Sequence, residues 1–576
     1  MSEVTQIKGL TPIELEAVPR VTDIRSQGEP ALWGLGGALS IGIIMIIGFL
    51  VLVLWNGIVT FVPKSIAVVA ELDGTVTAGE QFRSEVFKPA PDILAKLSPE
   101  WQKKIRSDNG YARRVLYRIG NFDLYGEDFR WVEDFNVRNT DYPEDMVFME
   151  RLEWGPFVGN IKNFTADGVE YVFTSLNDPI FKSAQQASRG LWSEITDIEQ
   201  HDIGEINYRL EQGRRDLRKI EIESGQSSPE YISAQKELEA RSIDLKRDYD
   251  RYAEKVQELR TRNSFYTLTL IEIGGLEKTI EFSDFVRVYA ANDLSLLQSS
   301  IIYFSRWWEF FSEEPREANT EGGVFPAIFG TAVMTLLMVV FVTPFGVITA
   351  LYLREYATQG RLVSFVRISV NNLAGVPSIV YGVFGLGFFA YLLGGSIDAL
   401  FYPERFPNPT FGTGGLLWAS LTLALLTVPV VIVATEEALA AVPRSVREGS
   451  LACGASKWQT IRYVVLPRAM PGIMTGIILA MARGAGEVAP LMLVGVVKLA
   501  PELPIDSFYP YIHFERSFMH LGFHIYDVGF QSRNAEAGKP MVFVTTVLLI
   551  SLIAAMNATA IVIRNRLKRK FTSSPF

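Results

Sequence analysis

Cysteine is almost absent from this chain, because Cys453 is the single one among 576 residues. An internal disulfide is therefore excluded, and the cysteine content does not indicate a redox compartment. The formal net charge of −9 argues against binding to nucleic acid. No glycine-rich run ends in Gly-Lys-Ser or Gly-Lys-Thr, since Gly454-Ala455-Ser456-Lys457 lacks the order needed to cradle phosphates. The sequence thus predicts no nucleotide-hydrolysing site.

We also expect no cleavable signal peptide. The first apolar run begins near Leu32, is too long for the apolar part of a signal peptide, and has no convincing small-residue cleavage site. We interpret it as the first of six membrane-spanning helices, each with roughly 20 mainly apolar residues. The predicted spans are Leu32–Leu54, Phe325–Leu353, Val366–Leu393, Gly414–Ala434, Ala469–Val494 and Met541–Ile563.

Basic residues near the ends of the spans predict the orientation. They gather after span two, after span four and in the C-terminal tail, which all lie on one side if there are six spans. They are Arg354, Arg361, Arg367, Arg444, Arg447, Lys457, Arg462, Arg468, Arg564, Arg566, Lys568, Arg569 and Lys570. That side should be cytoplasmic, so we expect a multi-pass inner-membrane protein with both termini in the cytoplasm.

The long stretch between the first two spans predicts an inserted extracytoplasmic domain. The expected organisation is a cytoplasmic tail (1–31), a first membrane helix (32–55), an extracytoplasmic α+β domain (56–323), and an all-α membrane domain of five further helices (324–576). Within the insert, residues 185–262 predict an antiparallel coiled-coil hairpin. Apolar residues recur there at heptad spacing, as in Tyr231, Leu238, Leu245, Tyr252 and Leu259, and Ser224–Pro229 supplies a turn.

Alternating apolar and polar residues predict strands elsewhere in the insert. Phe265–Ile273 and Thr279–Tyr289 flank Gly274-Gly275, which is typical of a β-hairpin. Val115–Ile119 and Val169–Phe173 are further candidate strands. The helical arm is either a spacer or a docking surface for a partner such as a substrate-delivering protein, and the sequence does not choose between them.

The loop over residues 436–467 carries the most informative local signals. Ser445 with Glu448, and Ser456 with Gln459, each form the capping-box pattern that opens a helix. Gly454 stands where a left-handed helix end is needed, and Pro467 is expected to stop the second helix. The loop therefore predicts two short capped helices on the cytoplasmic face.

This loop resembles the EAA loop of importer permeases, whose pattern is Glu-Ala-Ala, three residues, Gly, nine residues, Ile, one residue, Leu-Pro. Glu448, Gly454, Leu466 and Pro467 match that pattern; Gly449 and Ser450 replace the alanines, and Val464 replaces the isoleucine. The resemblance implies a coupling helix that sits in a groove of a separate ATPase subunit. The alternative is that Glu448 and Gly454 only cap a surface turn.

Two opposite charges lie inside the fifth predicted span. Arg483 and Glu487 are four residues apart, which places them on one face of a continuous helix. Ions in a span are costly and usually face a pathway or each other, and a guanidinium matches the oxygens of a phosphate-like anion. We expect Arg483 to contact or gate the anion with Glu487 as counter-ion; the alternative is a structural pair that fixes helix packing. Asn371 and Asn372, also polar at depth, are expected to join helices.

Three of the four histidines fall close together near the C-terminal half. His513, His520 and His524 have a spacing compatible with metal ligation. Packing among the neighbouring Phe514, Phe518 and Phe523 is the favoured alternative. We therefore predict no metal site.

The membrane half, from about Gly322 to Arg569, resembles phosphate permeases of the PstA type along its length. The stretches that carry the likeness are Gly322–Ile328 with Gly330-Thr331, Tyr352–Ala357, Asn372–Gly382 and Ala482–Leu491. Val488 replaces a threonine common in the family, and the long insert departs from its short members.

That family resemblance implies several partners. They are a second permease subunit of the PstC type, an ATPase subunit of the PstB type that uses ATP and Mg, an extracytoplasmic phosphate-binding protein of the PstS type, and membrane lipid. The chain itself would bind no cofactor and have no catalytic residue. It would couple ATP hydrolysis by the partner to inward phosphate transport.

Two other functions stay open. The chain could be the permease for another oxyanion such as sulfate, molybdate or phosphonate, which the coupling loop does not exclude and the stretches around Asn372 and Arg483 disfavour. The second is a membrane receptor whose insert senses a ligand. A receptor does not need an EAA-like loop, and no kinase-like or methyl-accepting segment follows span six.

Overall fold

The computed structural model describes residues 30–506, 509, 511–532 and 535–572. Most of the predicted cytoplasmic tail, 1–31, lies outside these residues. The chain divides into two compact units, Met1–Asn56 and Gly57–Phe576. The first unit contains most of the apolar helix α1 (Pro30–Val59), whose side chains are largely exposed along its length. A helix with no polar face is expected where lipid is the solvent.

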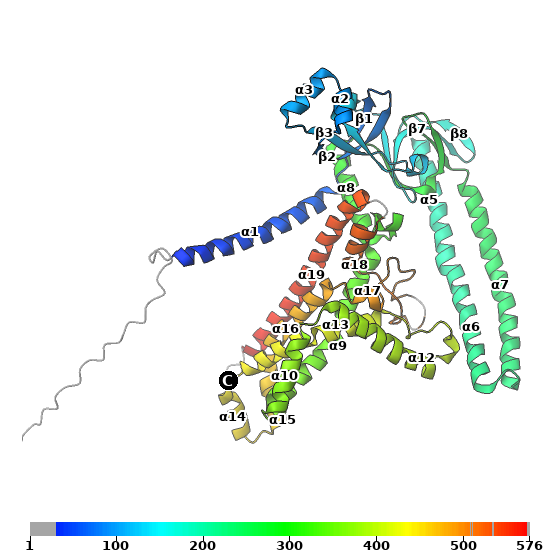
Figure 1. Cartoon of the computed structure of the whole chain (residues 1–576). Helices are drawn as coiled ribbons and strands as arrows, with labels where there is room; N and C mark the ends of the chain where they lie inside the picture. The colour runs from blue at the N-terminus through cyan, green and yellow to red at the C-terminus, as the bar shows by residue number, and fades with distance from the viewer. Residues whose placement is uncertain (1–29, 507–508, 510, 533–534, 573–576) are drawn as a thin grey trace, which may run out of the picture. The chain divides into compact units, whose positions relative to one another are not determined.

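The insert contains two antiparallel sheets (Figure 1). One has the strand order β4-β3-β2-β1-β5, and the other has the order β10-β9-β7-β6-β11 with β8 also paired to β7. The strands are β1 Ile66–Glu71, β2 Val76–Phe87, β3 Ala112–Arg118, β4 Phe129–Glu133, β5 Val137–Asp141, β6 Val147–Arg151, β7 Phe157–Ala166, β8 Val169–Val172, β9 Thr267–Ile271, β10 Glu277–Glu281 and β11 Phe285–Ala290. Short helices α2 Pro91–Lys96, α3 Pro99–Ser107 and α4 Phe122–Tyr125 lie between them. The prediction of an α+β insert is confirmed.

The predicted hairpin around Gly274-Gly275 is confirmed in its first half only. Strands β9 and β10 pair antiparallel across this turn, and Gly275 has a φ of +89°, which favours glycine. The second predicted strand, Thr279–Tyr289, is interrupted by a 3-10 turn at Phe282–Asp284. Because Phe282 turns into the core at this point, the chain changes neighbours, and β11 pairs with β6 instead.

The predicted helical hairpin is present. α5 (Pro179–Asp197), a π-helical segment η3 (Ile198–Asp202) and α6 (Ile203–Ser224) form one arm, and α7 (Pro229–Asn263) returns beside it (Figure 1). Ser228 caps α7 by accepting a hydrogen bond from the Tyr231 amide at 3.1 Å. A Cβ on Gly213 would lie 2.5 Å from Leu238, so the arms approach closely at this point. Near the sheet, Phe181 of α5 packs edge-on against Phe164 of β7.

Buried charges join the insert to the segment that leads into span two. Helix α8 (Leu296–Ser312) and the small sheet of β12 (Pro315–Arg316) and β13 (Glu321–Gly322) form this segment. Arg306 donates to Glu150 of β6 at 2.7 Å and to the carbonyl of Phe61 at 3.0 Å. Arg287 pairs with Glu150 and, at 2.9 Å, with Glu309. Burial raises the pKa of the Glu150 carboxyl, but Arg306 and Arg287 outweigh it, so the pKa is lowered overall.

Six helices among the described residues are long and apolar enough to cross a membrane, as predicted. They are Trp33–Val59, Phe325–Tyr356, Ser378–Phe401, Leu416–Ala440, Lys457–Gly486 and Ala535–Arg569, here named spans one to six. Their elements are α1, α9 Phe325–Leu351 with η6 Tyr352–Tyr356, α11 Ser378–Phe384 with η7 Gly385–Gly394 and α12 Gly395–Phe401, α13 Leu416–Ala440, α15 Lys457–Thr460 with η9 Ile461–Val465 and α16 Leu466–Gly486, and α19 Ala535–Thr572.

The predicted bounds of span three were wrong. The segment from Val366 breaks after α10 (Arg361–Leu373), and the span begins only at Ser378. Pro377 has no amide hydrogen and disfavours helical geometry at the residue before it, so the helix cannot run through this point. Asn371 and Asn372 therefore lie on α10, outside the candidate span, and are exposed in this chain. The expectation that they join spans at depth is not met.

Spans two, four and five form the packed centre of the membrane domain. α9, α13 and α16 all contact one another. A Cβ on Gly472 or Gly476 of α16 would lie within 2.5 Å of Ala438 or Ala434 of α13, and one on Gly484 would lie 2.4 Å from Met338 of α9. Lipid supplies no hydrophobic force between helices, so small residues that permit such close packing hold spans together.

The buried charge cluster yields a stability prediction. Glu150→Gln should destabilise the insert by about 3–5 kcal/mol, because it leaves Arg306 and Arg287 buried with one carboxylate fewer. Since the pKa of Glu150 is lowered in the fold, its contribution is present above the ordinary carboxyl range and is lost as the pH falls. Thermal unfolding of the purified chain, followed by amide exchange in β6 and β11, measures both effects.

Lys162→Gln is the matched control, because the Lys162–Glu277 pair is nearly half exposed on both sides. An exposed pair contributes about 1 kcal/mol or less. Equal losses in the two variants would show that the buried cluster does not stabilise the insert.

Candidate functional site

The predicted loop between spans four and five folds into a compact two-helix element. Helix α14 (Arg444–Ala452) ends at Gly454, whose φ is +84°, and α15 begins after Ser456. Ser450 and Thr460 share a hydrogen bond of 2.9 Å that joins the two helices. We call residues 443–465 the coupling element.

One of the two predicted capping boxes in this element is present. Ser456 and Gln459 exchange hydrogen bonds of 2.8 and 3.2 Å between side chain and backbone. The predicted box of Ser445 and Glu448 was wrong, because α14 begins at Arg444 directly after Pro443, which has no side chain able to cap. A proline fixes its own φ, and the helix therefore starts before Ser445 is reached.

The prediction that Pro467 stops the second helix of the coupling element was wrong. It runs on into span five, and Pro467 lies in the first turn of α16. The wider π-helical turn Ile461–Val465 precedes the proline. A π-helical turn accommodates a proline, which has no amide hydrogen to donate within the helix. The coupling element and span five are thus one continuous helix from Lys457 to Gly486.

Four contacts attach the coupling element to spans two and four. Arg447 donates to the carbonyls of Leu439 at 2.6 Å and Val442 at 3.1 Å, at the end of α13. Its guanidinium also pairs with Glu355 of η6 at 3.0 Å, with both side chains four-fifths or more buried. The Lys457 ammonium lies 4.7 Å from the ring centre of Tyr356, the next residue of η6.

The other residues of the EAA-like pattern lie around these contacts. Glu448 is exposed and has no recorded partner among the described residues, whereas Leu466 and Pro467 are partly buried. The outer surface of the element carries apolar side chains: Leu451 is 47% exposed, Trp458 53% and Tyr463 68%. Exposed apolar groups rimmed by polar ones are typical of a surface that a partner covers.

Arg483 and Glu487 approach each other at the far end of span five. Their Nε–Oε1 distance is 3.7 Å, which is longer than a hydrogen bond. Arg483 is in the last turn of α16, but Glu487 follows the helix with extended backbone. The prediction that the two residues share a helix face was therefore wrong. The Arg483 side chain is 37% exposed. The guanidinium therefore keeps donors available for another group.

The stretch that contains Glu487 packs against the start of span three. α17 (Leu491–Val494) contacts α11, and Gly382 lies against Pro490. The backbones approach so closely that a Cβ on Gly382 would lie 2.7 Å from the Cα of Pro490. Tyr381 donates to the carbonyl of Leu373 at 2.6 Å, which fixes the break before span three.

The three clustered histidines separate into two environments. His513 lies 3.1 Å from Asp506 and 3.2 Å from Glu515. His520 and His524, in and next to α18 (Leu521–Tyr526), are buried, and burial lowers the pKa of each to about 4. Both imidazoles are neutral at physiological pH. No group of three or more His, Cys, Asp or Glu side chains suited to a metal occurs in the described part of the chain.

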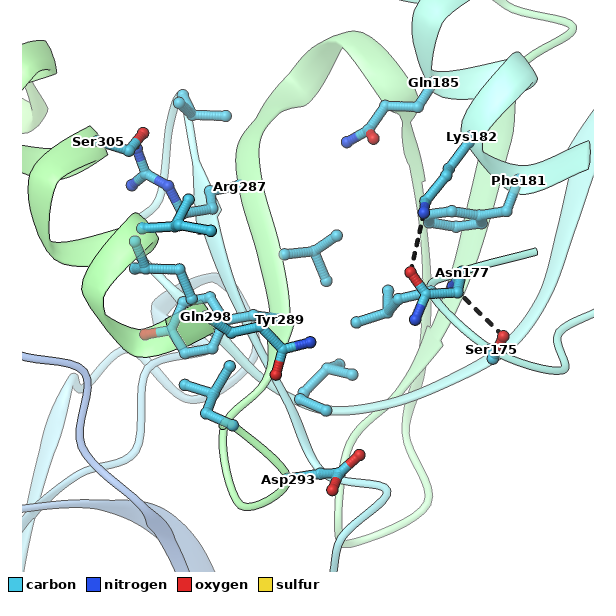
Figure 2. Close-up of a pocket in the computed structure, with 18 of the residues that line it drawn as sticks. Ser175, Asn177, Phe181, Lys182, Gln185, Arg287, Tyr289, Asp293, Gln298 and Ser305 are labelled. Carbon is cyan, nitrogen blue, oxygen red and sulfur yellow. Dashed lines mark hydrogen bonds between the residues drawn. The ribbon is translucent and has the colours of Figure 1, made fainter. Parts of the chain in front are cut away.

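A cavity of about 1000 Å³ lies in the insert, between α5, α8 and the edge strand β11. Figure 2 shows Lys182 and Gln298 on its opposite walls. Its basic side chains already have partners, since Lys182 donates to Asn177 at 2.8 Å, Arg189 to the Val286 carbonyl at 2.6 Å, and Arg287 pairs with two glutamates. This cavity is therefore a poorer candidate for an anion than the partly open Arg483.

Sequence reasoning missed Arg447, Glu355 and Tyr356 as site residues. Arg447 was considered mainly as a basic residue that predicts orientation. Glu355 and Tyr356 were considered only as part of Tyr352–Ala357, a stretch that resembles phosphate permeases. Their contacts join residues about 90 positions apart, and no local pattern reports such a distance. The isolated acid at the end of an apolar span was the one available signal.

The comparisons with known proteins agree with this architecture. Residues 342–570 match the model of the binding-protein-dependent transport system inner membrane component. The phosphate transport system permease protein PstA 1 of Mycobacterium tuberculosis is 35% identical over 261 residues, which is 45% of this chain and 76% of that protein. The probable ABC transporter permease protein YqgI of Bacillus subtilis is 30% identical over 44% of this chain and 84% of its own length.

Among solved structures, the inward-facing methionine ABC transporter MetNI covers 42% of this chain and 94% of its own chain. The identity is 21% and the TM-score 0.32. The six candidate spans and the matched family model define a permease of the ABC importer class. Within that class, the chain belongs to the PstA-type phosphate transport permease family. The matched model begins after the inserted domain.

The close contact of Gly382 yields a prediction about the site. Gly382→Ala should destabilise the fold by about 1–3 kcal/mol, because the added methyl group meets the backbone of Pro490 and cannot be accommodated by a side-chain rotation. Gly387→Ala is the control in the same span, since nothing lies within 4 Å of its Cβ position. Thermal unfolding of the detergent-purified chain compares them. Equal melting temperatures would contradict the close packing of span three against the stretch that follows span five.

Proposed function

We propose that this chain is the membrane-spanning permease subunit of an ATP-driven importer of inorganic phosphate. The observation that carries the proposal is the coupling element, an exposed two-helix surface that is continuous with span five and attached to span two. A rigid element of this kind can convert movement of a partner into movement of spans. Its exposed Leu451 and Trp458 suit a groove on a separate ATPase subunit that supplies ATP and Mg chemistry.

The transport direction and the partners follow from the family. We infer a second permease subunit, two ATPase subunits, and an extracytoplasmic phosphate-binding protein that delivers the anion. ATP binding would close the ATPase subunits and move the coupling element, so that the spans open outward to receive phosphate. Hydrolysis would return them to the inward-open state.

Arg483 supports an anionic substrate. A guanidinium offers paired donors that match the oxygens of phosphate, and the loose 3.7 Å contact with Glu487 leaves those donors accessible. The continuous helix from Lys457 to Gly486 is about 45 Å long at 1.5 Å per residue. It links the coupling element at one end with Arg483 at the other. Sulfate, molybdate or phosphonate could use the same donors, so selectivity needs a direct test.

The test of substrate is ATP-dependent uptake of labelled phosphate by the reconstituted complex, with sulfate as competitor. Arg483→Ala should reduce uptake about 10- to 100-fold, which corresponds to one charge-assisted interaction, while leaving assembly intact. Arg483→Lys should be intermediate, because it keeps the charge without the fork. Arg566→Ala removes an exposed arginine of span six, so it is the control and should transport normally.

Two results would contradict the proposal. Competition by sulfate at an equal concentration would identify a different oxyanion. A loss of complex assembly in Arg483→Ala equal to the loss of uptake would show that the charge pair only holds helices together.

Orientation gives an independent test. Cys453 is the single cysteine and is exposed at the tip of the coupling element. A membrane-impermeant maleimide should label it in inverted vesicles and spare it in intact cells. Labelling of Cys453 in intact cells would show that the coupling element cannot contact a cytoplasmic ATPase.

A further inference from the structure

Arg447 occupies a joint between three parts of the membrane domain. Its side chain leaves α14 and donates to the carbonyl of Leu439 in the last turn of α13 and to that of Val442 just after it. It also reaches Glu355 at the end of span two. The last carbonyls of a helix have no partner within that helix, and a cation there also complements the negative end of the helix dipole. Arg447 therefore ties the coupling element to span four as well as to span two.

The receiving end of this contact is the π-helical turn η6 (Tyr352–Tyr356). Glu355 receives the guanidinium and Tyr356 lies against Lys457, so neighbouring residues of one turn contact both helices of the coupling element. A π-helical turn is a local irregularity of the kind often found at functional positions. A displacement of α14 is thus delivered to a part of span two that departs from regular helix.

We propose that Arg447 is a positioning residue that transmits movement of the coupling element to span two through Glu355. This inference rests on the proposed function. It assigns the connection to a residue next to Glu448 that faces the spans, while the exposed face of the element stays available to the ATPase. Span five receives the same movement through its continuous helix, so Arg447 makes spans two and five move together.

A second ion pair on the same side of the membrane domain provides a matched control. Arg367 of α10 lies 3.3 Å from Glu436 of α13, with similar partial burial, but neither residue belongs to the coupling element. Loss of Arg367 removes a comparable interaction near the end of span four, together with a 3.5 Å contact to the Leu353 carbonyl of η6. It does not detach α14 from span two.

The experiment measures ATP hydrolysis and phosphate uptake in the same reconstituted complex. Arg447→Ala and Glu355→Ala should each lower the uptake per ATP hydrolysed about tenfold, while hydrolysis stays within about twofold of the unmodified complex. Arg447→Lys should recover part of the ratio, because it keeps the charge facing Glu355 but loses the second donor. Cross-linking from Cys453 to the ATPase subunit should be retained, which shows that docking is intact.

Double substitution tests whether the two residues act through each other. Arg447→Ala with Glu355→Ala should be no worse than the more severe single variant, because both remove one contact. Arg367→Ala should leave the ratio unchanged.

Three outcomes overturn the inference: hydrolysis and uptake that fall in proportion, independent effects that multiply in the double variant, or an Arg367→Ala complex that is equally uncoupled. Loss of the Cys453 cross-link would assign Arg447 to docking instead. If the unmodified complex hydrolyses ATP but imports no phosphate, the proposed function itself is wrong. This result differs from a failure of the inference about Arg447, because it is seen without any substitution.

Discussion

The close approach of spans two, four and five is the constraint on which the rest of the membrane domain depends. Gly472 and Gly476 bring α16 against α13, and Gly484 brings it against Met338 of α9. In lipid these helices are held together by packing alone, so a few glycines, which have no side chain, decide which helices are neighbours. The triplet carries the coupling element at one end and Arg483 near the other, and both candidate sites inherit their positions from it.

The apolar runs and the turns were predictable from the sequence, because each is encoded by residues that are close in the chain. Six spans, the helical hairpin and the α+β insert follow from apolar run length, heptad spacing and glycine turns. The bounds of spans three and five were less predictable. Pro377 and Pro467 look alike in the sequence, yet one precedes a break and the other lies within a continuous helix. The difference is the π-helical turn before Pro467, which no residue pattern reported.

In the candidate site, too, the local features were predictable from the sequence and the long-range contacts were not. Gly454 and the Ser456–Gln459 cap follow local rules and are present, and the Arg483–Glu487 pair forms although Glu487 lies beyond the helix. Arg447 and Glu355 could not be paired in advance, because 92 residues separate them. The strand exchange after Phe282 had the same origin, since burial of that ring in a non-local core outweighed the alternating pattern around it.

The helical arm of the insert is held at two places. Its base is built into the sheet through Phe181, and further along α6, Tyr208 donates to the carbonyl of Tyr509 at 3.0 Å while the helix lies against Pro403–Arg405. Helix α6 thereby connects the insert to the loops before spans four and six. Between the two attachments lies η3, the π-helical turn at Ile198–Asp202. If the loops move relative to the sheet of the insert, the arm must bend or the hydrogen bond of Tyr208 must break. The π-helical turn η3 is the place where a long helix bends most easily.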